Sequence, residues 1–234
     1  MFELARIDHW WDISRRFPVL RETGRGVLKA LGYAHVVERL LAERPTRVLE
    51  FGHGWGSPLM DLFAAELELW GLDDHVEVPY WTREQFMARA AQCRERQPRV
   101  RYVDGLMGAG RNALPDASFD LVCSVSVLEE LEPPAISEIV ADAARLLRPG
   151  GLFVNSMDCT TRFTERVEHF FARQEAEGLR FLKPGSSPVL DWSIHDVAFE
   201  DPCFVMRYYM GYQPDEGRQW PANFATVLSA SRKP

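Results

Sequence analysis

The stretch Thr46-Arg-Val-Leu-Glu-Phe-Gly-His-Gly-Trp-Gly-Ser57 decides the fold of this chain. Its first half is typical of a buried strand, because three apolar side chains stand close together. Its second half alternates glycine with other residues, and an amphipathic helical pattern follows. The apolar strand positions are Val48, Leu49 and Phe51, and the glycines are Gly52, Gly54 and Gly56. A strand, a glycine turn and a helix predict a nucleotide-binding loop, since glycine permits close backbone approach and a helix start offers free N–H groups.

Acidic residues accompany this loop. Glu50 stands two positions before the first glycine, and Asp73 ends a second short apolar run about twenty residues after Gly52. A carboxylate at the end of the second strand of a βαβ unit can accept hydrogen bonds from ribose hydroxyls. The dinucleotide fingerprint Gly-x-Gly-x-x-Gly would require a third glycine where Ser57 stands. Taken alone, the loop is also compatible with an ordinary strand-to-helix turn and a helix-capping aspartate.

Three further motifs follow the loop in order. They are Leu114-Pro-Asp-Ala-Ser-Phe-Asp-Leu-Val122, Val127-Leu-Glu-Glu130 and Leu146-Leu-Arg-Pro-Gly-Gly-Leu-Phe-Val154. With the glycine loop they resemble the class I S-adenosylmethionine-dependent methyltransferases of the small-molecule, type 11 kind. The resemblance covers about residues 46–158 and matches the flanking segments only loosely. It implies methyl transfer from S-adenosylmethionine to an oxygen, nitrogen or carbon nucleophile of a small molecule or peptide side chain, with S-adenosylhomocysteine as product.

Strand and helix patterns alternate along the chain, which indicates a doubly wound α/β sheet. Strands are predicted at 46–51, 68–73, 100–103, 119–125, 152–156, 203–210 and 224–230. Helices are predicted at 24–43 with a break or bend at Gly32, at 56–67, at 82–97 from a capping box at Thr82-Arg-Glu-Gln85, at 135–147 and at 161–177. The resemblance implies a Rossmann-like, seven-stranded, mostly parallel sheet with helices on both faces.

We expect one methyltransferase domain over residues 1–234. Residues 1–45 would form an N-terminal helical lid or cap, and residues 46–158 the cofactor-binding core. Residues 159–234 would form the substrate-pocket segment and a C-terminal strand pair.

In a doubly wound sheet the ligand lies beyond the carboxyl ends of the strands. The resemblance implies that the three glycines enclose the methionine part and sugar of the cofactor, that Glu50 opens the loop and that Asp73 binds the ribose. Ser124 ends the fourth strand of the core and joins these candidates. The third strand departs from the family pattern Gly-Asp-Ala, whose aspartate bonds adenine, because Asp104 stands one residue early. Either Asp104 reaches the adenine through a shifted turn, or it only forms an Asp-Gly turn.

Three residues are candidates for proton handling. His195 is the best general base, because imidazole titrates near neutrality, and a purely structural role is its alternative. Asp158 follows the fifth strand of the core. Glu130 stands where relatives often have histidine, and is either a carboxylate beside the cofactor or substrate or a solvated residue at a helix start. His53 would face the substrate cavity or contribute only its backbone.

Charge and composition limit the kinds of partner that this protein is expected to bind. The formal charge of −7 argues against nucleic-acid binding, which usually needs a basic face. No apolar stretch approaches the roughly 20 residues of a membrane span, and the first residues carry no signal-peptide core, so we expect a cytoplasmic protein without a membrane partner. The histidines lack ligand spacing and the acids are not clustered, so no metal site is predicted. The sequence does not indicate the oligomeric state.

Two other functions stay open from the sequence. The chain can bind the cofactor without transferring methyl, as a regulatory or partner subunit. It can also be a nicotinamide-dependent oxidoreductase on a similar βαβ unit, although Ser57 in place of a third glycine argues against that.

Overall fold

The computed structural model describes residues 2–4, 7–21, 27–74, 82–108, 112–160, 164–182 and 224–234. The strands are β1 (Phe2–Leu4), β2 (Arg47–Phe51), β3 (Glu68–Asp73), β4 (Arg101–Asp104), β5 (Phe119–Val125), β6 (Leu147–Thr160), β7 (Arg180–Phe181) and β8 (Phe224–Arg232). The helices are α1 (Ile7–Arg16), α2 (Val27–Glu43), α3 (Pro58–Phe63), α4 (Arg83–Arg96), α5 (Pro133–Leu146) and α6 (Thr164–Ala176), with 3₁₀ turns η1 (Pro18–Arg21) and η2 (Leu128–Glu130).

The strands form one sheet in the order β1-β8-β6-β5-β2-β3-β4, and the short β7 pairs with β8. β2 to β6 run parallel to one another, whereas β8 runs antiparallel to β6, β1 and β7. The predicted mostly parallel α/β sheet is therefore confirmed. Its ligand edge is the one at which the parallel strands end.

Most predicted elements are present, with shifted bounds. β5 has the predicted bounds, and β8 covers the strand predicted at 224–230. α3 is shorter than the predicted helix 56–67, because it begins at Pro58, which suits a first helical turn, and ends at Phe63. β6 begins at Leu147, earlier than predicted, because Leu147 already pairs with Phe119 of β5; the register then shifts before pairing resumes at Leu152. The strand predicted at 203–210 lies outside the described residues.

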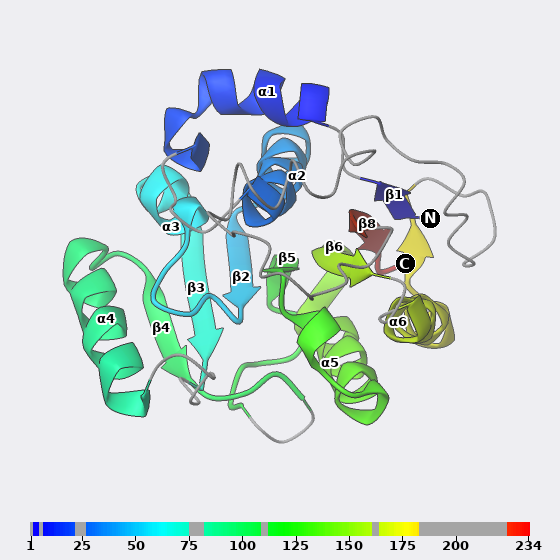
Figure 1. Ribbon diagram of the computed structural model, residues 1–234. Helices are drawn as coiled ribbons and strands as arrows, with labels where there is room; N and C mark the ends of the chain where they lie inside the picture. Colours follow the sequence, from blue (N-terminus) through cyan, green and yellow to red (C-terminus); the bar gives the residue numbers. More distant parts are fainter. Residues whose placement is uncertain are drawn as a thin grey trace, which may run out of the picture.

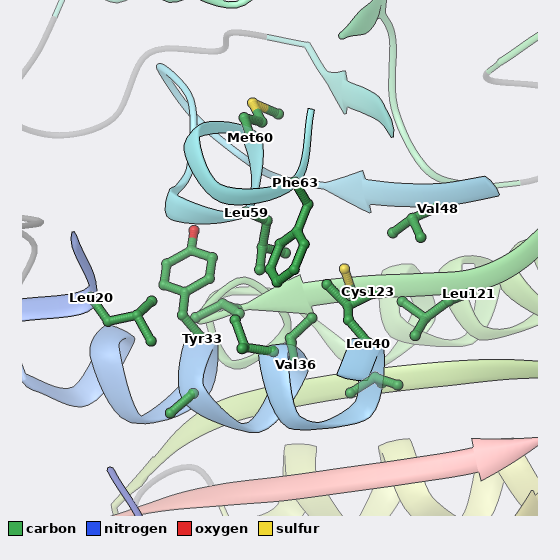
Figure 2. Packing of buried hydrophobic residues seen from close by; sticks show 14 of the residues in the cluster. Leu20, Tyr33, Val36, Leu40, Val48, Leu59, Met60, Phe63, Leu121 and Cys123 are labelled. Carbon is green, nitrogen blue, oxygen red and sulfur yellow. The ribbon is translucent and has the colours of Figure 1, made fainter. Parts of the chain in front are cut away.

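The sheet buries a separate apolar cluster on each face, because neighbouring strand residues point to opposite sides. Val48 and Leu121 pack with residues of α2 and α3, whereas Leu49 and Val122 pack with residues of α5 and α6. Figure 1 shows α2 and α3 on one side of the sheet and α5 and α6 on the other. Figure 2 shows the first cluster, in which side chains of α2 point toward those of the strands and of α3. Helices thus cover both faces, as predicted.

α2 lies directly against the carboxyl ends of β5 and β6. A Cβ atom on Gly32 would lie 2.1 Å from Oγ of Ser156 and 2.8 Å from Cγ1 of Val125. The break or bend predicted at Gly32 is wrong, because α2 continues through it from Val27 to Glu43. Here glycine serves close packing of a helix on a sheet, which its local sequence context does not distinguish from a helix break.

Candidate cofactor and active site

The glycine loop follows β2 and depends on three left-handed backbone conformations. The φ angles are +67° at Gly52, +65° at Gly54 and +108° at Gly56. A Cβ atom on Gly52 would lie 2.5 Å from Cγ2 of Val127, and one on Gly56 would lie 2.1 Å from Sγ of Cys93. At Gly54 the nearest such contact is the Phe86 ring at 3.5 Å, which is an ordinary van der Waals distance. Neighbouring side chains therefore exclude a Cβ atom at Gly52 and Gly56, whereas Gly54 is required mainly by its positive φ.

Glu50 braces the loop from the end of β2. It is only 3 % exposed, and its carboxylate accepts hydrogen bonds from the Tyr33 hydroxyl at 3.2 Å and from Oγ of Ser57. Figure 2 shows Tyr33 rising from α2 toward α3 and Leu59. These contacts connect α2, β2 and the start of α3. The contact of Tyr33 with Glu50 could not be predicted from the sequence, since the position of Tyr33 on its helix is typical of any core residue.

Asp73 lies against the loop, as predicted. Its Oδ2 accepts the backbone N–H of Gly54 at 2.8 Å, and the N–H of Gly52 donates to the carbonyl of Leu72 at 2.9 Å. The end of β3 and the glycine loop therefore form one unit. A carboxylate and a glycine backbone at the ligand edge suit the ribose and the adjoining part of a nucleoside.

His53 points away from the ligand edge. It is 3 % exposed, and its ring centroid lies 5.6 Å from that of Tyr102 on β4. A Cβ atom on Gly71 of β3 would lie 2.9 Å from the imidazole ring, so the ring fills the space that this glycine leaves. The geometry agrees with the interpretation in which His53 contributes its backbone to the loop.

Asp104 and Ser124 end their strands near the ligand edge, but other residues engage both. Asp104 lies opposite Asp73 in the β3–β4 register, is largely exposed and forms an ion pair with Arg94. Ser124 is buried, and its hydroxyl donates to Oδ1 of Asn155 on β6 at 2.9 Å.

Asp158 is the catalytic candidate that the structure places among polar partners. Its Oδ2 accepts the Ser126 hydroxyl and its Oδ1 accepts the Thr226 hydroxyl, each at 3.2 Å. Burial raises the pKa of Asp158 to about 6, against the lowering effect of Lys29 and of these two hydroxyls. Glu130, the second candidate, is exposed at the end of η2. His195, the third, lies outside the described residues.

Glu129 is a buried carboxyl that sequence analysis did not single out. It is 3 % exposed, and its Oε1 accepts the backbone N–H of Asp158 at 3.2 Å. Burial and the charge of Asp158 raise the pKa of Glu129 well above its ordinary value. The motif contains two adjacent glutamates, and only the η2 turn decides which of them points inward.

The described residues contain neither a metal-binding cluster nor a membrane-spanning helix. No group of three or more His, Cys, Asp or Glu side chains there is placed to hold a metal ion. No helix in the same part of the chain has the length and apolar character needed to cross a bilayer.

A family model described as "Methyltransferase domain" matches residues 49–155. This range contains the glycine loop, Asp73 and the three later motifs. No curated protein sequence matches the chain significantly. The comparisons lend no support to a nicotinamide oxidoreductase or to a non-catalytic subunit.

Solved structures share the fold at low sequence identity. The [4+2]-cyclase SpnF is 19 % identical with a TM-score of 0.54, over 86 % of this chain and 82 % of that one. A TehB-like S-adenosylmethionine-dependent methyltransferase from Corynebacterium glutamicum is 17 % identical with a TM-score of 0.53. The match covers 98 % of this chain and 100 % of that one. The N-methyltransferase NodS from Bradyrhizobium japonicum, in complex with S-adenosylhomocysteine, is 16 % identical with a TM-score of 0.52, over 86 % of each chain. Over residues 49–155 the chain is therefore similar to the methyltransferase domain family, and it shares its fold with S-adenosylmethionine-dependent methyltransferases.

Proposed function

We propose that this protein transfers the methyl group of S-adenosylmethionine to an oxygen, nitrogen or carbon nucleophile of a small molecule or peptide side chain. The observation that carries the proposal is the hydrogen bond of 2.8 Å between the Gly54 backbone N–H and the Asp73 carboxylate. This contact holds the candidate ribose-binding acid against the glycine loop, at the edge of the sheet where such folds bind ligands, and so supports the proposal.

The residues present fit this cofactor. Gly54 has no side chain and a positive φ of +65°, so its backbone can approach a ligand closely. Asp73 offers its carboxylate to the ribose hydroxyls, and the backbone of the loop would hold the methionine part and sugar. Glu50 acts through the loop, because Tyr33 and Ser57 already engage its carboxylate.

Asp104 and Ser124 remain weaker candidates for cofactor binding. Asp104 would have to leave Arg94, and Ser124 would have to leave Asn155, before either reached a ligand. Each exchange replaces an existing hydrogen bond, so its net gain is small.

The cofactor supplies a methyl group that is already activated on a sulfonium, so the protein mainly aligns the acceptor and excludes water. An acceptor that attacks through a hydroxyl or an ammonium must also lose a proton. We assign the receiving role to Oδ1 or Oδ2 of Asp158, because its raised pKa of about 6 makes it a stronger base than an ordinary aspartate. Glu130 and His195 remain candidates for contact with the acceptor.

Residues 1–45 would act as the cap of this site. α1 packs on α2, and the ring of Phe17 lies 6.0 Å from that of Phe63 on α3, between centroids. These contacts support a cap that rests on the two helices bordering the glycine loop. Residues 159–234 would shape the acceptor pocket.

Calorimetric titration of the purified protein with S-adenosylmethionine, S-adenosylhomocysteine and NAD tests the cofactor assignment. We expect saturable binding of the first two and none of NAD. Binding of NAD alone, or no binding of any of the three by folded protein, would overturn the proposal. A screen of hydroxyl, amine and carbon acceptors with labelled methyl donor then tests the transfer.

A further inference from the structure

Glu129 and Asp158 meet where β5 and β6 end. Oε1 of Glu129 accepts the backbone N–H of Asp158, as described above. The other carboxyl oxygen of Glu129, Oε2, is buried and has no hydrogen-bond partner in the described part of the chain. A buried carboxylate oxygen without a donor is costly, whereas a protonated carboxylic acid carries no charge to desolvate.

The two carboxyls have unequal support for a negative charge. Asp158 accepts hydroxyl hydrogen bonds from Ser126 and Thr226, and it is attracted by Lys29 of α2. The side chain of Glu129 has only backbone donors in the described part of the chain, the N–H groups of Asp158 and of Glu129 itself, and no cation is among the groups that act on its pKa. Donors and a nearby cation favour the ionised form, so Asp158 is the member of the pair that loses its proton first.

Among the charged residues around the pair, Lys29 favours the ionised form of Asp158. Glu130, adjacent on η2, repels a negative charge on either carboxyl. Arg166 of α6 donates to the backbone carbonyl of Glu129 at 2.6 Å and pairs with Glu132. Lys29 is the cation whose charge acts on Asp158. Two desolvated carboxyls that interact in this way lose their protons in separate steps.

We propose that Glu129 is a positioning residue for methyl transfer, because its buried Oε2, which has no donor in the described part of the chain, keeps the proton of the pair and confines the negative charge to Asp158. This inference rests on the proposed role of Asp158 as proton acceptor. A charged Glu129 would repel the charge on Asp158 and leave more of that residue protonated at neutral pH. A neutral Glu129 keeps Asp158 ionised and still basic.

Carboxyl-carbon NMR titration of the intact protein tests the inference without cofactor or acceptor. Loss of one resonance in each of Glu129→Gln and Asp158→Asn assigns the two groups. We expect Glu129 to titrate above Asp158, whose midpoint should lie near pH 6. Asp158→Asn should lower the Glu129 midpoint by about one pH unit or more, because a neighbouring charge is removed. Glu129→Gln should move the Asp158 midpoint by less than about half a pH unit, because a neutral group replaces a neutral group.

The inference is overturned if Glu129 titrates near the ordinary value of about 4.3, which would make it charged at neutral pH. It is equally overturned if Glu129→Gln lowers the Asp158 midpoint by about one pH unit. If the glutamine variant does not fold, the wild type and Asp158→Asn still measure the Glu129 midpoint. Failure here leaves cofactor binding intact, whereas failure of the calorimetric titration leaves these midpoints unchanged, so the two proposals are tested separately.

Discussion

The backbone N–H of Gly54 donates a hydrogen bond of 2.8 Å to Oδ2 of Asp73, which joins the glycine loop after β2 to the end of β3. This contact fixes the position of the carboxylate that would meet the ribose.

Asp73→Ala should weaken S-adenosylmethionine binding by about tenfold or more. A hydrogen bond to a charged group contributes roughly 1.5–3 kcal/mol, and 1.4 kcal/mol corresponds to a factor of ten. Asp104→Ala is the matched comparison, because Asp104 lies opposite Asp73 in the register but is paired with Arg94. We expect a change of less than about threefold for it, since an exposed ion pair contributes little. Calorimetric titration measures both, and wild-type affinity in folded Asp73→Ala would contradict the assignment.

Gly56→Ala should destabilise the fold more than Gly150→Ala does. Both glycines have positive φ, at +108° and +80°, but a Cβ atom on Gly56 would lie 2.1 Å from Sγ of Cys93, whereas one on Gly150 would meet nothing within 4 Å. Backbone strain alone costs roughly 1–2 kcal/mol, and overpacking adds about 1–3 kcal/mol at Gly56. Urea unfolding of both variants gives the free energies. Equal losses of unfolding free energy would mean that the loop moves away from α4 without cost. In the double variant, Cys93→Ala should restore part of the stability that Gly56→Ala removes.

Asp142→Ala should cost about 3 kcal/mol of the free energy of unfolding, because it removes a buried carboxylate on which several hydrogen-bond donors depend. The Asp142 side chain is 0 % exposed and accepts hydrogen bonds from the Gly108 N–H, from Asn112 and from Arg145. These contacts attach the segment after β4 to α5. Asp116→Ala removes another partner of Arg145, but that side chain is 74 % exposed. Asp116→Ala should cost less than about 1 kcal/mol. Similar losses for the two variants in chemical denaturation would contradict this explanation.

Asp158 should make the protein more stable as the pH falls from 6 toward 4. Its pKa is raised from 3.8 to about 6, so the folded state binds more protons than the unfolded state in that window. Relative to wild type, Asp158→Asn should therefore gain stability as the pH rises from 4 to 7. Glu68→Gln should behave oppositely, because the hydrogen bond from Arg47 lowers the pKa of Glu68 and its stabilising charge is lost at low pH. Urea unfolding at pH 4, 5, 6 and 7 checks both slopes, and parallel curves for the three proteins would contradict the two assignments.

Local sequence patterns determined much of the architecture. The apolar run at Val48 and Leu49 predicted β2, and the Thr82–Gln85 capping box predicted the start of α4, where Gln85 N–H donates to Oγ1 of Thr82 at 3.2 Å. The positive φ at Gly52, Gly54 and Gly56 agrees with the loop that their spacing predicted. Such signals are short-range, because propensity, alternation and capping depend on residues a few positions apart.

Only the tertiary structure decided which polar side chains meet. Glu50 is held by Tyr33, which lies 17 positions away, and Gly32 is a packing site because Ser156 comes up against it. Glu129 rather than Glu130 is buried, because the η2 turn directs it toward Asp158, 29 positions along the chain. Hydrogen bonds and burial of this kind arise when distant segments are packed together. The sequence by itself therefore determined the strand, loop and helix of the candidate cofactor site, whereas the contact between Glu129 and Asp158 was decided by which segments the fold brings together.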